Sequence, residues 1–189
     1  MLLDEDTSSA IAEIGNLCIA GGSNQISHFS DEMVDISVVS ATIRTKEEIM
    51  LEIDPSDSCR IYSKLDIDGD VKGNFIVQFS EEILENTLEK FPKMFSVKEN
   101  KNRDAKLFEL VANFFEGFSQ GLSGMTGLEA KATGTPELIT DFDFTNFPEK
   151  VLCFNSVITV GEDRIDFTVY FFSNADVLIP KVLESLGMA

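Results

Sequence analysis

The chain has 189 residues, of which 43% are hydrophobic, and its formal net charge at pH 7 is −18. This length suits one domain, or one domain built from two related halves, with enough apolar residues to bury a substantial core. The acidic charge argues against nucleic acid as a partner, because affinity for a phosphate backbone comes from lysine and arginine. It also argues against docking on an anionic membrane, so a basic protein partner, or no partner, fits better.

The sequence indicates neither secretion nor insertion into a membrane. Its start, MLLDEDTSS, has no basic n-region and no apolar h-region, and no apolar run reaches the roughly 18 residues of a spanning helix. Cys18, Cys59 and Cys153 are scattered without a CxxC pair, which is typical of free thiols in a reducing compartment. We therefore expect a soluble, cytoplasmic protein.

The first predicted element is an amphipathic helix that starts in the stretch SSAIAEIGN, residues 8–16, and continues to residue 26. At about 100° per residue, one side of this helix carries an apolar stripe that predicts the face packed in the core: Ile11, Ile14, Cys18, Ile19 and Ile26. The opposite face carries Ser9, Glu13, Asn16 and Ala20. The small side chains there leave Glu13 and Asn16 accessible, although a solvated helix face is the ordinary interpretation of such a pair. The glycine pair 21–22 either bends the helix or allows close packing.

A strand is expected over 33–43, followed by a β-hairpin over 65–80 and a charged amphipathic helix over 80–90. Alternating apolar residues indicate the hairpin, with Gly69 at its turn. The helix is expected to be a solvated cover for a sheet edge, with a partner surface as the lesser alternative.

The stretch DIDGDVKG, residues 66–73, has acidic residues spaced as in a calcium-binding loop. An EF-hand needs glycine at its sixth position and glutamate at its twelfth. Here those positions hold Val71 and Val77. The hairpin interpretation is therefore favoured over a calcium site.

The second half of the chain repeats the order of elements in the first half. Each half reads as long helix, strand, hairpin and short helix, with the polar stretch 98–104 as the linker. The aligned segments are 11–26 with 108–122, 33–43 with 128–139, and 65–88 with 158–183. In this alignment Asn113 falls on Asn16 and Phe172 on Phe79. Chance similarity between two α+β halves is the alternative.

These repeats predict one α+β domain over residues 1–189, with halves of about 1–97 and 98–189. The halves would be related by a pseudo-twofold axis and share one sheet. With about three strands from each half, we expect a roughly six-stranded, mostly antiparallel sheet with the two long helices on one face.

The stretch SSAIAEIGNLCIAGGSNQIS, residues 8–27, resembles the signature helix of the CheC/CheX/FliY family of chemotaxis phosphatases. That motif is Asp or Ser, three residues, Glu, two residues, Asn, and a proline further along. Ser9, Glu13 and Asn16 fill the first three places here, whereas Val39 stands at the proline position. The resemblance covers most of the chain, since the family shows the same twofold repeat.

The second long helix carries a degenerate copy of this motif. Asn113 and Pro136 are present, but Leu110 stands at the Glu position and Lys106 at the Asp or Ser position. Glu109 lies one residue away and is expected to face a similar direction. The resemblance therefore implies one active site per chain, as in CheX-like members, with a second helix that is mainly structural.

The resemblance implies a phosphatase that acts on the aspartyl phosphate of a CheY-like response regulator. Asn16 would orient the attacking water, because an amide both donates and accepts hydrogen bonds. Glu13 would anchor the complex by pairing with a cation of the regulator, its active-site lysine. Ser9 and Ala20 are expected at the partner contact. The regulator would supply its own aspartate and divalent metal (Mg²⁺), so no cofactor or metal ligand of this chain is implied.

Other interpretations stay open. The alternative function is a non-catalytic module that binds a response regulator or serves as a flagellar-switch-like scaffold, because switch proteins share the fold of this family. A homodimer is also open, since some relatives exchange strands or pair sheet edges. Cys18 is expected to be a small buried hydrophobe. His28 is expected to be a terminal residue favoured by the helix dipole rather than a catalyst.

Overall fold

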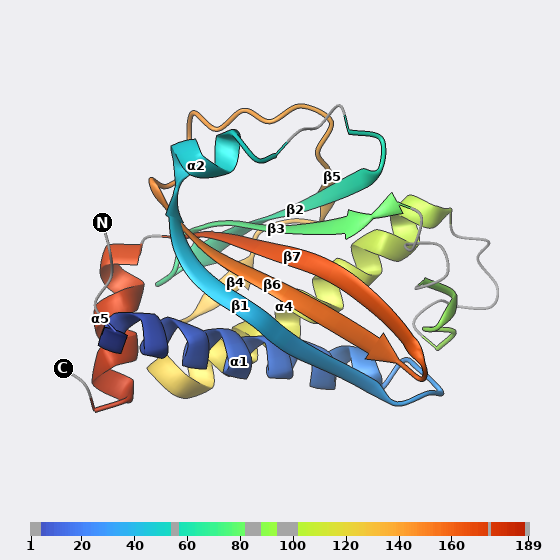
Figure 1. Cartoon of the computed structure of the whole chain (residues 1–189), viewed down its shortest axis with the longest axis horizontal. Helices are drawn as coiled ribbons and strands as arrows, with labels where there is room; N and C mark the ends of the chain where they lie inside the picture. Colours follow the sequence, from blue (N-terminus) through green and yellow to red (C-terminus); the bar gives the residue numbers. More distant parts are fainter. Residues whose placement is uncertain (1–4, 54–56, 82–87, 94–101, 174, 188–189) are drawn as a thin grey trace.

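The computed structural model describes residues 5–53, 57–81, 88–93, 102–173 and 175–187. One antiparallel sheet forms the centre of the molecule, and two long helices cover one of its faces (Figure 1). These helices are α1, Glu5–Ser27, and α4, Arg103–Thr126. The predicted α+β class is confirmed, as is the packing of two long helices on one face.

Within the described residues the sheet has seven strands, in the order β1-β6-β7-β3-β2-β4, with β5 also paired to β2. Their bounds are Val34–Thr45 (β1), Arg60–Gly69 (β2), Gly73–Ser80 (β3), Ala130–Ala132 (β4), Glu137–Leu138 (β5), Lys150–Val160 (β6) and Asp163–Ser173 (β7). Exchanging β1 with β4, β2 with β6 and β3 with β7 gives the same strand order read from the other edge of the sheet. An axis perpendicular to the sheet, between β3 and β7, therefore relates the halves and keeps both long helices on one face.

The strand predicted over 128–139 is wrong as a single element. Only the short strands β4 and β5 pair with β2 there, and Gly134 and Pro136 lie between them. Proline cannot donate to a strand ladder, and glycine weakens a strand interior. One edge of the sheet is therefore broken, whereas the other is the long strand β1.

The predicted alignment of the two hairpins is wrong, because it superposes residues that lie on opposite faces of the sheet. Phe79 belongs to the core between the sheet and the long helices, whereas Phe172 belongs to a smaller core on the opposite face. Successive side chains of a strand point to opposite faces, so two equivalent residues cannot differ in this way. The alignment failed because Phe171 and Phe172 are both buried, and neither face of this strand end is marked by a polar residue.

Two hydrophobic cores flank the sheet. In the larger core, Phe75 lies with its ring centroid 5.0 Å from that of Phe118 and 5.1 Å from that of Phe115. The smaller core lies on the face opposite α1 and α4, under α2 (Lys46–Met50) and residues 139–149 (Figure 1). Strands buried on both faces read as continuous apolar runs rather than alternating ones, as β6 and β7 do.

The long helices contact each other through their backbones at Gly21 and Gly117. A Cβ on either glycine would overlap the carbonyl oxygen of the other, so any larger residue would push the helices apart. A Cβ on Gly22 would likewise overlap the ring of Phe114. The close packing offered by the glycine pair 21–22 is therefore confirmed.

The hairpin β2–β3 is confirmed, with Gly69 at φ 127°, and α5, Ala175–Ser185, follows β7 as predicted. Residues 82–87 of the helix expected over 80–90 lie outside the described residues, as do residues 98–101 of the expected linker. The rest of that linker belongs to α4, because the side chain of Asn102 accepts a hydrogen bond from the amide of Ala105 (2.9 Å) and caps the helix.

Across the described residues, no helix combines the length and the apolar character needed to cross a membrane.

Candidate functional site

The two faces of α1 are those expected from the sequence. The apolar stripe is buried, with at most 2% of each residue exposed: Ile11, Ile14, Cys18, Ile19 and Ile26. Ser9, Glu13, Asn16 and Ala20 are all exposed on the opposite face. The helix thus presents the predicted site residues to solvent while its other side anchors it to the sheet.

Glu13 and Asn16 lie three residues apart in α1, so their side chains are neighbours on the helix surface. Within the part of the chain that the structure describes, neither side chain forms a hydrogen bond or an ion pair. A carboxylate without a cation and an amide with both donors and its acceptor available are adjacent. This pair can bind a cation and a polar group of a partner at the same time.

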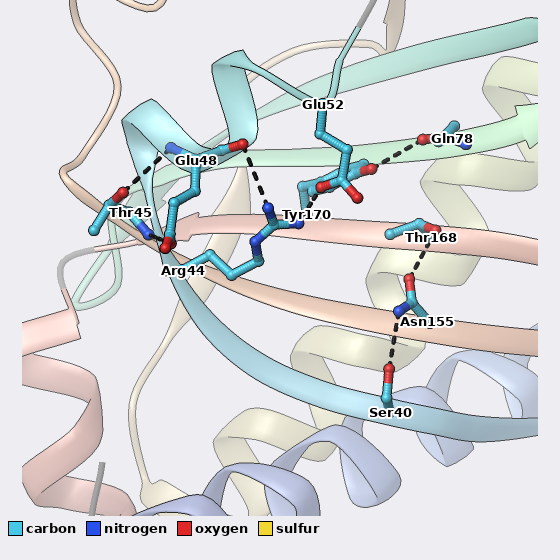
Figure 2. Close-up of polar contacts among 9 residues, drawn as sticks. All are labelled: Ser40, Arg44, Thr45, Glu48, Glu52, Gln78, Asn155, Thr168 and Tyr170. Atoms are coloured by element: carbon cyan, nitrogen blue, oxygen red, sulfur yellow. Dashed lines mark hydrogen bonds and ion pairs between the residues drawn. The ribbon is translucent and has the colours of Figure 1, made fainter. Parts of the chain in front are cut away.

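A second polar cluster lies on the face of the sheet opposite α1 and α4, called the open face here because none of the described long helices covers it (Figure 2). Arg44 binds the carboxylate of Glu52 and donates to the carbonyl of Glu48 (3.4 Å). Thr45 and Glu48 form a capping box at the start of α2. Because these groups satisfy one another, the cluster fixes α2 against the sheet, and sequence analysis did not find it.

Tyr170 and the buried cysteines are held in their neutral forms. Burial raises the pKa of the Tyr170 phenol, whose hydroxyl donates to Gln78 Oε1 (2.9 Å; Figure 2). Burial also raises the pKa of the Cys153 thiol to about 12 and that of Cys18 further still. Neither thiol is a thiolate near neutral pH, so neither is an activated nucleophile. The expectation that Cys18 is a small buried hydrophobe is confirmed.

His28 follows directly after the last residue of α1 and is exposed. This is the terminal position expected for it.

No family model matches the sequence, and no curated protein matches it. Solved structures do match over nearly the whole chain. FliY from Thermotoga maritima is similar with a TM-score of 0.76 and 16% identity, covering 100% of both chains. The middle domain of FliM from H. pylori has a TM-score of 0.64 at 12% identity and covers 97% of this chain and 99% of that one. CheX from Desulfovibrio desulfuricans has a TM-score of 0.53 at 12% identity, with 86% and 99% covered.

The chain has the CheC/CheX/FliY fold. At these identities the likeness establishes the architecture, and the expected family resemblance is confirmed at that level.

The proline position of the CheC/CheX/FliY motif falls on a β-bulge of the edge strand. The pairing of β1 with β6 shifts between Val38 and Ser40, which makes Val39 the additional residue, and its side chain is 65% exposed. Prolines inside sheets are confined to edge strands and bulges because they lack an N–H donor. In this chain the backbone at that position is irregular although it holds valine and not proline.

Polar side chains on the open face secure the strand next to this bulge. Asn155 Nδ2 donates to Ser40 Oγ (2.9 Å), and Thr168 Oγ1 donates to Asn155 Oδ1 (3.1 Å; Figure 2). The row joins β1, β6 and β7 side by side. Sequence analysis missed these residues because only the register of three strands brings them together.

The second copy of the CheC/CheX/FliY motif is altered in its register as well as in its residues. The reciprocal contact makes Gly21 and Gly117 equivalent, so that Glu109 corresponds to Glu13 and Ala112 corresponds to Asn16. The predicted superposition of Asn113 on Asn16 is therefore wrong by one residue.

The surroundings of this second copy differ accordingly. Asn113 is half-buried, and its Nδ2 donates to the backbone carbonyl of Glu109 (2.8 Å). Leu110 and Pro136 are buried. Glu109 is also half-buried, with Oε2 inaccessible to solvent, and Ala112 offers no amide. The second helix therefore does not expose a carboxylate and an amide as α1 does.

Proposed function

We propose that this chain is a phosphatase that hydrolyses the aspartyl phosphate of a CheY-like response regulator, with its single active site at Asn16 and Glu13. The observation that carries the proposal is the exposed Glu13–Asn16 pair on α1, which has no partner among the described residues. Its support is that this pair and Ser9 fill the first three positions of the motif, together with the CheC/CheX/FliY fold.

The residue types suit the reaction. The oxygen of a water molecule attacks the phosphorus in line with the acyl oxygen, and the bond between phosphorus and that oxygen breaks to release the aspartate carboxylate and inorganic phosphate. Such a reaction needs positioning and charge stabilisation more than covalent catalysis. The Asn16 carbonyl would accept a hydrogen bond from the water while its NH₂ group donates to a phosphoryl oxygen. The protons of the water pass to phosphate and solvent.

Glu13 is assigned the anchoring role in this proposal. Its carboxylate has no cation within the described chain, and the regulator's active-site lysine would supply one. An ion pair at this contact aligns the two proteins as well as attracting them. Ser9 and Ala20 flank the pair, and their small side chains allow a close approach. The regulator contributes its own aspartate and its own Mg²⁺.

The second candidate function is a non-catalytic module that binds a regulator or serves as a flagellar-switch-like scaffold. The structural likeness to the FliM middle domain and the valine at position 39 favour it. The two functions differ in one observable, because a phosphatase shortens the lifetime of the phosphorylated regulator, whereas a scaffold binds it and leaves that lifetime unchanged.

The deciding experiment measures the dephosphorylation rate of a phosphorylated CheY-like regulator from the same organism. We expect wild-type chain to accelerate it, and Asn16→Ala to reduce that acceleration by about 100-fold, the scale of losing one positioned group in a transition state. Because Asn16 is exposed, the free energy of unfolding should change by no more than about 0.5 kcal/mol.

Asn113→Ala is the matched control, since it removes the same amide from the second helix. Retained activity in this variant is expected, and loss only in this variant would move the site to α4. A folded wild-type chain that accelerates none of the organism's stand-alone regulators would reject the phosphatase in favour of the scaffold.

A further inference from the structure

Gly15 lies between Glu13 and Asn16 and faces the sheet. A Cβ built on it would lie 2.8 Å from both Cδ1 and Cε1 of Phe154 and 3.6 Å from Cβ of Ala41. Real Cβ atoms essentially never come within 3.0 Å of another heavy atom. The backbone of α1 therefore rests directly on the Phe154 ring, in the same turn that carries the two site residues.

The sheet beneath Gly15 has little freedom to move away. Phe154 is fully buried, and its ring centroid lies 6.3 Å from that of Phe118. Phe154 pairs with Ala41 across β6 and β1, and the next pair, Asn155 and Ser40, is joined by a side-chain hydrogen bond on the open face (Figure 2). Protein interiors are packed as densely as organic crystals, so an added methyl group must displace the helix.

The helix is also held further along its length. At Gly21 its backbone packs against the backbone of α4 at Gly117, and an outward shift of the whole helix would break this packing. A methyl group at position 15 would therefore lift the turn containing Glu13 and Asn16 while the crossing at Gly21 stays in place.

We propose that Gly15 is a positioning residue for Asn16: its missing side chain seats α1 on Phe154 and so sets the height of the Asn16 amide above the sheet. The consequence for catalysis rests on the proposed phosphatase function, whereas the positioning itself does not. Glu13 anchors the partner through a longer and more adaptable side chain. A lifted turn should therefore affect the reaction more than the binding of the regulator.

The test compares Gly15→Ala, Phe154→Leu and the double variant in the dephosphorylation of the phosphorylated regulator. Gly15→Ala should lower kcat by about 10-fold or more, because small misplacements of a positioned group are costly, and leave KM within about twofold. Gly15→Ala/Phe154→Leu should restore most of kcat, because leucine lacks Cε1 and its Cδ atoms can turn away from the added methyl group. Gly124→Ala is the control, since nothing lies within 4 Å of that added methyl, and it should leave both constants unchanged.

A spectroscopic readout separates this inference from the proposed function. In ¹⁵N NMR spectra, the side-chain amide resonances of Asn16 should shift in Gly15→Ala and return toward their wild-type positions in the double variant. If wild-type chain accelerates no regulator, the phosphatase proposal fails, and these resonances alone decide the positioning role. Unchanged Asn16 resonances in folded Gly15→Ala would overturn it, and so would an unchanged kcat in an active protein.

Discussion

Asn16 and Asn113 are the same residue type on two related helices, yet their surroundings give them different capacities. The Asn16 amide is exposed and has no partner among the described residues. The Asn113 amide donates to the carbonyl one turn before it, which withdraws a donor from any partner. The environment, and not the residue type, therefore leaves the Asn16 amide available to a partner and ties the Asn113 amide to its own helix.

Val39 allows a test of the β-bulge in β1. Because it is the additional residue of a bulge in an edge strand, proline should fit there without losing a ladder hydrogen bond. Val39→Pro should leave the free energy of unfolding unchanged or raise it by up to about 1 kcal/mol, through a more restricted unfolded chain. Urea unfolding followed by circular dichroism measures this.

The matched control is Val169→Pro, in a strand paired on both sides. It should cost about 3 kcal/mol or more. If Val39→Pro destabilised the protein as much as this control, Val39 would be an ordinary ladder residue and the bulge assignment would be wrong.

At the scale of elements, the relation between α1 and its neighbours is fixed by glycines. Gly15 seats the helix on the sheet, and Gly21 seats it on α4. At both positions the backbone of α1 itself makes the contact, so no side chain of α1 can adjust the distance to the neighbouring element. The exposed face of α1 is consequently held in place by contacts that the opposite side of the helix makes with the sheet and with α4.

Gly21→Ala tests this arrangement. Its methyl group would meet the Gly117 carbonyl, and overpacking against backbone should reduce the free energy of unfolding by about 3 kcal/mol or more. Gly124→Ala, a helical glycine with open space around it, should instead raise it by about 0.5–1 kcal/mol. Equal effects of the two substitutions in chemical unfolding would show that the helices do not touch at Gly21.

The molecule as a whole is strongly acidic: the chain has 33 acidic and 15 basic residues, which gives a formal net charge of −18 at pH 7. Most described cations are already in ion pairs with carboxylates, such as Lys90 with Glu32 and Asp163, and Lys64 with Asp66 and Glu137. The remaining negative charges repel one another in the folded state. They also favour a partner that brings a cation to Glu13.

Salt should therefore stabilise the fold. Raising NaCl from about 10 mM to about 150 mM shortens the Debye length from about 30 Å to about 8 Å, which screens repulsion more than it weakens short ion pairs. We expect a higher Tm by calorimetry, with an equal gain in KCl as the control for screening. A Tm that falls with salt would mean that attractive pairs outweigh the net repulsion.

Features that depend on local periodicity were predictable from the sequence. The buried and exposed faces of α1 follow from helical spacing, and the β2–β3 hairpin follows from alternation around Gly69. The α+β architecture followed from the repeated order of these elements. The exposed Glu13 and Asn16 were found in the same way, because a helix face is a property of one short segment.

The tertiary structure decided everything that depends on residues distant in the sequence. The bulge at Val39 and the correction at Phe79 are matters of strand register, which apolar residues on both faces of a strand leave unmarked. The correction at Asn113 depends on where α1 and α4 cross, at Gly21 and Gly117. The contact of Gly15 with Phe154 is a further case, since 139 positions of chain separate an unremarkable helix glycine from the ring that supports it. Sequence spacing identified which side chains face outward, and packing between distant segments determined where they are held.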